Sequence, residues 1–426
     1  FDLPITIAVL SALEKIPEKS TENTLFIGEM SLNGDINSVS GILPIVLKAK
    51  EEGFKTCVIP YANAREASIV EGITIIPVKS ITEAIGYCKG EFVPAVYFDN
   101  HISPDLKCID FSDVNGQTLV RRACEIAVTG LHNLLLVGPP GAGKSMIAQR
   151  IPTILPDMSF SEQIEVTRIY SVCGKLEEAG GLITKRPFRS PHHTISPQGL
   201  SGGGSVPKPG EVTLAHKGVL FLDELTEFNK RTLEILRQPM EDKKITISRT
   251  ERSVTFPSDF LLVAALNPCQ CGYYPSERCR CTYNSIKNYL GKISQPLLDR
   301  IDLCVEAKEV NFNDLIQKNK NESSEDIRKR VEAAREFAKD RFTGTDILFN
   351  SQIPSNMIET YCKLDEKESR FIGKMYEKLG LTARSYHKIL KVARTIADLD
   401  FSEDIKVSHL TEAICYRSID KKYWEA

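Results

Sequence analysis

The feature that most constrains this chain is a glycine-rich octapeptide, Gly138-Pro139-Pro140-Gly141-Ala142-Gly143-Lys144-Ser145. It matches the phosphate-binding pattern G-x-x-x-x-G-K-[ST] and lies between an apolar run at residues 134–137 and a helix-forming stretch at residues 146–151. A buried strand, a glycine-rich turn and a helix in this order direct backbone N–H groups and the helix dipole at phosphate oxygens. The sequence therefore predicts a nucleotide site in which Lys144 contacts the terminal phosphates and the Ser145 hydroxyl binds Mg²⁺.

Composition places the chain among ordinary soluble globular proteins. It has 426 residues, of which 42% are apolar and 26% charged, and this length predicts two to three domains. The net charge of −2 gives no overall indication of nucleic acid, so such a partner must be argued from local patches. No run reaches the ~18 apolar residues of a membrane span, and no charged-then-apolar leader is visible, so we expect no membrane partner.

The cysteine content and the first residue add two further expectations. Twelve cysteines are too dilute for a disulfide scaffold in a chain of this length, which together with nucleotide binding predicts the reducing cytoplasm. The chain starts at Phe1 without a methionine, so we expect that upstream residues are missing and that the first domain is incomplete.

Two more apolar strands end in polar residues suited to ATP hydrolysis. Residues 218–222 read as a strand buried on both faces of a parallel sheet, and Asp223 and Glu224 follow it directly. Asp223 is predicted to complete the Mg²⁺ shell and Glu224 to act as the base that polarises the attacking water. A third strand at residues 260–265 leads to Asn267, which is placed to orient that water or to touch the γ-phosphate.

The order of these elements, followed by Leu297-Leu298-Asp299-Arg300-Ile301-Asp302, resembles that of AAA+ ATPases and is most similar to the magnesium-chelatase-like branch. Three segments are diagnostic of that branch: Pro187-Phe188-Arg189-Ser190-Pro191-His192-His193-Thr194, Gly210-Glu211-Val212-Thr213-Leu214-Ala215-His216-Lys217-Gly218 and Leu236-Arg237-Gln238-Pro239-Met240-Glu241-Asp242. More narrowly, essentially the whole chain resembles the YifB/ComM family, whose members are described as DNA helicases that promote branch migration during natural transformation.

The resemblance implies ATP and Mg²⁺ as cofactors, a ring that is a hexamer, and roles for three residues: Asn267 as sensor 1, Arg300 as the arginine finger and Arg384 as sensor 2. An arginine is always ionised and stabilises phosphate oxygens that gain charge in the transition state. If Arg300 serves a neighbouring subunit, hydrolysis requires the ring. The alternatives are a surface arginine paired with Asp299 or Asp302, and simple solvation of Arg384.

Helical patterns flank the ATPase motifs. Residues 117–130 predict a helix that ends at a Gly130 C-cap and leads into the phosphate loop. After a polar linker at residues 317–326, residues 327–341 begin an all-α lid. Within this lid Arg384 opens a helix with one apolar face.

The first 95 residues predict a small α/β domain, with strands at residues 25–29, 56–60 and 73–76 and a helix at residues 43–52. Its glycine, Gly-Phe-Lys and Ile-Pro landmarks resemble the S5-type proteolytic domain of Lon proteases, which use a serine and a lysine. Leu43 stands where the lysine of that family is expected, and an alkyl side chain cannot act as a base. We therefore expect a non-peptidase relative used for assembly or binding.

Two insertions suggest a nucleic-acid partner. Residues 186–209 are rich in Gly, Ser and Pro and contain bases but no acid, so this loop is expected to point into the pore of a ring rather than to pack a core. In residues 243–256, apolar and polar residues alternate on both sides of a Thr-Glu turn, which predicts a basic hairpin. Basic loops contact phosphates without reading sequence, which favours DNA; the alternative is exposed interface elements. His192 and His193 are adjacent, a spacing that disfavours one shared metal ion.

Four cysteines, Cys269, Cys271, Cys279 and Cys281, form two close pairs directly after Asn267. Two pairs of thiolates can close a tetrahedral zinc site, although C-x-C is tighter than the usual spacing. Matching cysteines recur in the resembled family, which favours structural Zn²⁺. Free thiols and a redox role remain alternatives.

We therefore predict an α/β protein with three domains. These are a truncated, catalytically inactive Lon-like domain at residues 1–95, a P-loop AAA+ core with a parallel sheet, pore-loop insertions and the cysteine cluster at residues 96–310, and a helical lid at residues 311–426. The predicted function is an ATP-hydrolysing ring motor that translocates on branched or single-stranded DNA. The alternatives are the motor subunit of a magnesium-chelatase-type complex and a nucleotide-switched protein-binding or remodelling module.

Overall fold

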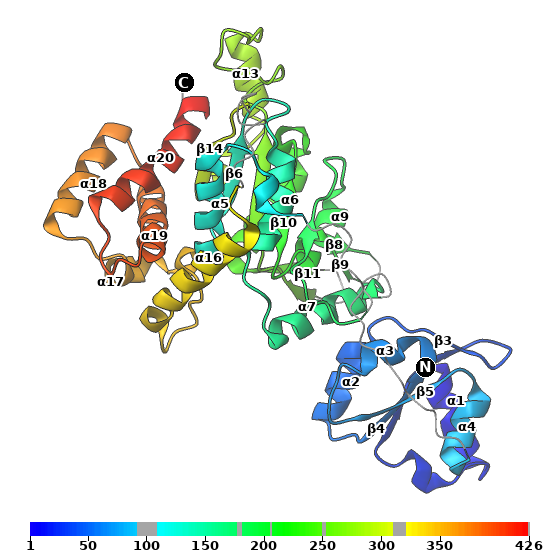
Figure 1. Ribbon diagram of the computed structural model, residues 1–426. Helices are drawn as coiled ribbons and strands as arrows, with labels where there is room; N and C mark the ends of the chain where they lie inside the picture. Colours follow the sequence, from blue (N-terminus) through cyan, green and yellow to red (C-terminus); the bar gives the residue numbers. More distant parts are fainter. Residues whose placement is uncertain (92–108, 177–180, 205–206, 249–252, 310–320, 425–426) are drawn as a thin grey trace. The chain divides into compact units, whose positions relative to one another are not determined.

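The computed structural model describes residues 1–91, 109–176, 181–204, 207–248, 253–309 and 321–424 (Figure 1). The chain forms two compact units: a small unit, Phe1–Leu106 with Met158–Lys185, and a large unit, Lys107–Asp157 with Arg186–Ala426. The predicted domain boundaries near residues 95 and 310 lie outside the described residues, so the three-domain division stays a prediction. No helix in the described part of the chain is long and apolar enough to cross a membrane.

The small unit is an α/β domain built on three parallel strands in the order β1-β4-β5: β1 Thr24–Phe26, β4 Thr56–Pro60 and β5 Thr74–Val78. An antiparallel pair, β2 Glu29–Met30 and β3 Ile36–Asn37, lies outside this sheet. The helices are α1 Asp2–Ala12, α2 Ile42–Glu51, α3 Ala64–Ala67, α4 Ile81–Lys89 and α7 Phe160–Val172. The predicted strand at residues 25–29 is therefore two strands, because the chain leaves the parallel sheet to pair with β3.

Alternating residues of β4 separate two apolar clusters in the small unit. Val58 packs with Leu3 and Ile7 of α1, whereas Cys57 and Ile59 pack in the cluster that contains α2. Leu43 is fully buried in this second cluster. The position that the sequence landmarks align with the lysine of the Lon family therefore holds an apolar core side chain.

The large unit contains five parallel strands in the order β14-β6-β13-β10-β7. Their bounds are β6 Leu134–Val137, β7 Phe188–Arg189, β10 Val219–Leu222, β13 Leu261–Leu266 and β14 Leu303–Glu306. All residues of β6, β10 and β13 are buried, which confirms the predicted sheet with two covered faces. Because β13 lies between β6 and β10, the loops that follow these three strands are neighbours.

Helices cover both faces of this sheet. Leu134 and Leu136 of β6 face a cluster that includes residues of four helices: α5 Thr118–Gly130, α6 Lys144–Ile154, α16 Ser324–Lys339 and α19 Ala383–Leu399. Figure 1 shows α5 and α6 over this face. Leu135 and Val137 face the opposite cluster, to which α11 Lys230–Glu234, α12 Arg237–Asp242, α13 Tyr283–Leu290 and α14 Gln295–Leu298 contribute.

The C-terminal part is helical, as predicted for the lid. Besides α16 and α19 it contains α17 Ile358–Tyr361, α18 Glu366–Leu379 and α20 Val407–Trp424. Helix α20 packs on α19 and reaches β14, where the Tyr423 hydroxyl donates to Glu306 Oε1 at 2.7 Å. The helical part is thus fastened to the edge strand of the sheet.

The insertion at residues 186–209 packs more tightly than expected. Its residues Phe188 and Arg189 form the edge strand β7, and it continues through α9 Pro197–Ser201 and the antiparallel pair β8 Gly202–Gly203 and β9 Lys208–Pro209. Leu200 of α9 is fully buried in the apolar cluster behind β10. The expectation that this loop packs no core was wrong. Strand β7 pairs with β10, and Leu200 is buried in the core.

The predicted basic hairpin is confirmed as an antiparallel pair, β11 Lys244–Ser248 and β12 Ser253–Pro257. Its predicted Thr-Glu turn lies outside the described residues. The short helix α10 Glu211–Leu214 precedes β10.

The helix that leads into the phosphate loop ends differently from the prediction. Gly130 is the last residue of α5, and Leu131 is the left-handed cap with φ 53°. A Cβ on Gly130 would lie 2.3 Å from His132 Nε2 and 2.5 Å from Thr395 Oγ1. Gly130 is therefore required for close packing, and the cap falls one residue later.

His132 gives the fold a testable pH dependence. Burial lowers the pKa of His132 from 6.5 to about 4, although the charge of Asp302 raises it. Between pH 6.5 and pH 4, His132 is therefore protonated in the unfolded chain but neutral in the folded chain. The free energy of unfolding consequently falls as the pH drops through this window, by up to about 3 kcal/mol.

We expect His132→Asn to flatten the fall in unfolding free energy between pH 7 and pH 4.5. Urea unfolding followed by the fluorescence of Trp424, the chain's single tryptophan, measures this. The exposed His192→Asn provides the matched control. An unchanged pH slope in His132→Asn would contradict the assignment.

Candidate nucleotide-binding site

The phosphate loop sits at the carboxyl edge of the large sheet, between β6 and α6. Gly138 begins the loop where its N–H donates to Leu266 O of β13 at 3.2 Å. A Cβ on Gly138 would lie 2.2 Å from Ala307 O, just beyond β14, so only glycine fits between these two strand ends. Helix α6 begins at Lys144 with Gly143 as its N-cap, as the sequence motif predicts.

Lys144 is buried and its ammonium group has three acceptors. Its Nζ donates to Gly138 O at 2.7 Å, to Pro139 O at 2.9 Å and to Asn267 Oδ1 at 3.1 Å. Burial lowers the pKa of Lys144, while the charges of Asp223 and Glu224 oppose the shift. The structure thus brings the predicted phosphate-binding lysine together with the predicted sensor asparagine.

Ser145 and Asp223 meet beside this lysine. The Ser145 hydroxyl donates to Asp223 Oδ2 at 2.5 Å, and Asp223 Oδ1 accepts the Glu224 N–H at 2.9 Å. A hydroxyl and a carboxylate at this spacing are the oxygen ligands that Mg²⁺ takes beside nucleotide phosphates. The residues present therefore fit the predicted magnesium site.

Glu224 follows β10 in an uncommon backbone conformation. Its φ of 51° lies in the left-handed region, which is uncommon for a residue with a side chain, and its carboxylate is exposed. His193 Nδ1 lies 3.5 Å from Glu224 Oε2. The sequence analysis did not anticipate this pair, although His193 belongs to one of the segments that carried the family resemblance.

The two arginines lie at the opposite edge of the sheet. Asn133, which directly precedes β6, donates from Nδ2 to Arg300 O at 3.0 Å, and Arg300 precedes β14. Strands of four residues separate this amino edge from the phosphate loop by about 13 Å. The structure therefore does not bring Arg300 to the phosphate loop of its own chain.

Glu241 of α12 joins Arg300 to Arg384. Its Oε1 lies 2.8 Å from Arg300 Nη2 and 2.6 Å from Arg384 Nη2. Burial raises the pKa of Glu241, but the hydrogen bonds and charges of the two guanidinium groups outweigh it and hold the pKa below its ordinary value. Arg300 is thus paired with Glu241 rather than with Asp299 or Asp302, the partners considered from the sequence.

The basic residues of the two insertions differ, because some are hydrogen-bonded within the large unit and others are exposed. Arg189 forms two hydrogen bonds to the Glu211 carboxylate at 2.6 and 2.8 Å, and Arg186 donates to Pro156 O and Lys217 O. These two arginines therefore hold the insertion to the large unit. Lys208 of β9 and Lys244 of β11 are exposed.

The four predicted cysteines converge. All four Sγ atoms lie within 4.8 Å of one another, so these cysteines could together hold a metal ion. The cluster begins two residues after Asn267 and ends before α13. The structure thus confirms that the two C-x-C pairs form one cluster.

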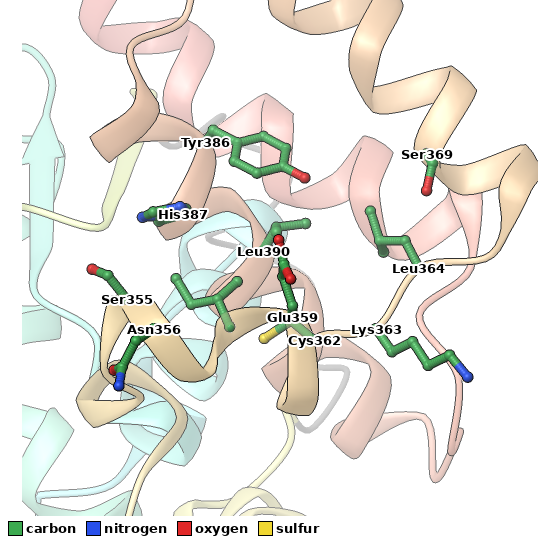
Figure 2. A pocket seen from close by; sticks show the side chains of 11 residues that line it. Ser355, Asn356, Glu359, Cys362, Lys363, Leu364, Ser369, Tyr386, His387 and Leu390 are labelled. Carbon is green, nitrogen blue, oxygen red and sulfur yellow. The ribbon is translucent and has the colours of Figure 1, made fainter.

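A separate cavity of about 510 Å³ opens among the lid helices α17, α18 and α19. Figure 2 shows His387 and Ser355 on one side of it and Leu364 and Ser369 on the other. Its lining includes none of the residues of the phosphate loop or of the arginine pair. The cavity is therefore distinct from the nucleotide site.

Comparison with known families covers most of the chain. "Magnesium chelatase, subunit ChlI" matches residues 110–315, its C-terminal family matches residues 321–417, and "Subunit ChlI of Mg-chelatase" matches residues 1–63. The Competence protein ComM of Haemophilus influenzae is 38% identical over 98% of this chain and 82% of its own length. The protein YifB of Escherichia coli is 38% identical over 99% of this chain and 82% of its own. The chain belongs to the YifB/ComM family of magnesium-chelatase-like AAA+ ATPases.

Two more distant relatives match smaller parts of the chain. Lon protease 2 of Bacillus subtilis is 26% identical over 44% of this chain and 38% of its own length. The Magnesium-chelatase 38 kDa subunit of Acidiphilium rubrum is 24% identical over 70% of this chain and 87% of its own. Both agree with the resemblances found in the sequence, and the family supports an ATPase with ATP and Mg²⁺.

For this YifB/ComM protein, Glu241 is, besides His193, a residue beside the predicted site residues whose contacts the sequence analysis missed. It lies in the family segment at residues 236–242, but its two partners are far away in the sequence. We expect Glu241→Gln to release both guanidinium groups and to lower the ATPase kcat about tenfold or more, with the Kd for ATP unchanged. Steady-state kinetics and equilibrium binding of a fluorescent ATP analogue measure the two effects.

Asp242→Asn, at the exposed neighbouring position of the same helix, is the control for Glu241→Gln. It removes one negative charge without touching either arginine. Equal kcat values for the two variants would show that the bridge through Glu241 has no part in turnover.

Proposed function

We propose that this protein is an ATP-hydrolysing ring motor, a hexamer that translocates on branched or single-stranded DNA as a helicase. One observation carries the ring: the groups suited to bind ATP lie at the carboxyl edge of the sheet, and Arg300 and Arg384 lie at the amino edge. A nucleotide in the phosphate loop reaches these arginines only if a second protomer presents them. The proposed active site therefore spans two copies of the chain.

Each residue then has a separate task in hydrolysis. Lys144 and the loop N–H groups hold the phosphates, and Lys144 exchanges its contacts with Gly138 O and Pro139 O for phosphate oxygens. Ser145 and Asp223 would hold Mg²⁺, which when bound would neutralise charge on the phosphate oxygens. Glu224 accepts the proton of the attacking water, and Asn267 orients that water. Arg300 and Arg384 of the neighbour stabilise the charge that develops on the γ-phosphate.

DNA as the partner is supported by the relatives and by two exposed lysines. One relative is named a competence protein, which favours DNA uptake or recombination over other work. Lys208 and Lys244 lie on neighbouring elements, because a Cβ on Gly202 of β8 would touch Ile247 of β11 at 3.0 Å. Exposed lysines on adjacent hairpins suit contacts to a phosphate backbone.

The motor subunit of a magnesium-chelatase-type complex is the second candidate. The matched family descriptions and the relative from Acidiphilium rubrum favour it. Recovery of a large chelatase partner with the purified protein would favour this candidate over DNA translocation. We also propose structural Zn²⁺ at the four cysteines.

The shared site predicts complementation between two inactive variants. Lys144→Ala disables the phosphate loop and Arg300→Ala removes the finger, so each alone should have little ATPase activity. In randomly mixed rings about a quarter of the interfaces combine an intact loop with an intact finger, so mixing should restore activity toward that fraction. Steady-state ATPase assays of the two variants, alone and mixed, test this. Full activity of Arg300→Ala alone, or mixed rings without recovery, would contradict a shared site.

The proposed partner predicts DNA-dependent turnover. We expect single-stranded or four-way-junction DNA to stimulate the ATPase, and the double variant Lys208→Ala, Lys244→Ala to bind DNA more weakly with a shallower salt dependence. Fluorescence anisotropy and ATPase assays measure both. Lys367→Ala, an exposed lysine of α18, is the control, and Glu224→Gln gives the background without hydrolysis. The proposal would be overturned if no DNA changed the ATPase rate and if the protein bound no DNA even at low salt.

A further inference from the structure

We infer that Cys269, Cys271, Cys279 and Cys281 bind one Zn²⁺ and that the resulting zinc loop, residues 269–281, braces the phosphate loop. Metal occupancy then sets the affinity for ATP. The metal site stands on its own geometry, and its effect on ATP binding rests on the proposed function of the phosphate loop.

The sulfur geometry matches a tetrahedral zinc site. Cys269 Sγ lies 3.3 Å from Cys271 Sγ and 3.8 Å from Cys279 Sγ, and Cys271 Sγ lies 3.7 Å from Cys279 Sγ. A tetrahedron with Zn–S bonds of about 2.3 Å has sulfur atoms about 3.8 Å apart. A disulfide requires about 2.05 Å, which these three pairs exceed. The four thiols are thus spaced as ligands around one ion.

The ligand set also indicates the kind of site. Four soft sulfur ligands favour Zn²⁺ over Mg²⁺ or Ca²⁺, which prefer oxygen. Four protein ligands close the coordination sphere and leave no position for water or substrate. The site is therefore structural and adds no second catalytic metal beside Mg²⁺.

The loop between the cysteine pairs contains no regular strand or helix, although several of its side chains pack on the apolar cluster behind β10. Its backbone hydrogen bonds are turns, Gly272 N–H to Cys269 O, Ser276 N–H to Tyr273 O and Cys279 N–H to Ser276 O. Arg278 stacks on the Tyr273 ring at 4.1 Å and pairs with Glu309 at the surface. A bound metal supplies the cross-link that a segment without regular strands or helices lacks.

One close contact and one short link along the chain connect the zinc loop to the nucleotide site. Gly272, at φ +84°, packs so closely on the phosphate loop that a Cβ there would lie 2.3 Å from Pro140 Cδ. The loop also begins two residues after Asn267, which accepts a hydrogen bond from Lys144. A change in the zinc loop therefore displaces the phosphate loop directly and the lysine through its asparagine partner.

The test begins with the metal content of the full chain. Elemental analysis of protein produced with zinc present should give one zinc per chain. In a second assay, a mercurial reagent should release this zinc, which a chromophoric chelator then detects. Cys271→Ser and Cys279→Ser should each lose zinc, whereas Cys415→Ser, an exposed cysteine of α20, should keep it. Zinc-free wild-type protein, or cysteine variants that retain a full zinc equivalent, would overturn the metal site.

The second part of the test distinguishes zinc binding from the effect of the zinc loop on ATP affinity. We expect zinc release to raise the Kd of a fluorescent ATP analogue at least about tenfold. Gly272→Ala should keep its zinc and still weaken the analogue, because the new methyl group displaces Pro140. If the cysteine variants do not fold, Gly272→Ala and mercurial titration of the wild-type chain still decide the question.

The outcomes distinguish this inference from the proposed function. Normal nucleotide affinity in zinc-free protein and in Gly272→Ala would overturn the brace. Wild-type, zinc-loaded protein that binds no ATP would overturn the proposed function and the brace together, and the zinc equivalent would still support the metal site. Zinc-dependent ATP binding without any response to DNA would support the brace and contradict the motor.

Discussion

All five strands of the large sheet run in the same direction, and the chemistry of this protein depends on that constraint. Alternate side chains bury both faces in two apolar clusters, so polar groups are excluded from the faces and collect where strands end. The carboxyl ends of β6, β13 and β10 are neighbours. Lys144, Asn267 and Asp223 consequently meet although they are far apart in the sequence.

The same constraint separates the two halves of the proposed active site. Residues that precede the strands lie at the amino edge, and Arg300 is one of them. Glu241 gathers Arg300 and Arg384 into a paired cationic group with one shared carboxylate oxygen. A protomer thus carries the predicted nucleotide site on one edge of the sheet and the two arginines paired with Glu241 near the other. Under the proposed function, hydrolysis therefore depends on assembly, because neither half suffices alone.

The predictions that the structure confirms rest on local patterns. Strand, glycine turn and helix are adjacent in the sequence, so the phosphate loop and the start of α6 follow from steric rules and hydrogen bonding over a few residues. Alternation predicted the hairpin β11-β12, and helical periodicity predicted α5, α16 and α19. The two C-x-C pairs also met as expected, because a short loop separates them.

What the sequence determined by itself is the type of each element and the chemistry available at its ends, since dihedral preferences and residue spacing act over short distances. Only the tertiary structure decided that Arg300 pairs with Glu241, that His193 faces Glu224, that Leu200 is core and that Gly272 abuts Pro140. Each of these contacts joins segments that many residues separate. Packing in three dimensions selects such partners, and a linear pattern carries no record of that selection.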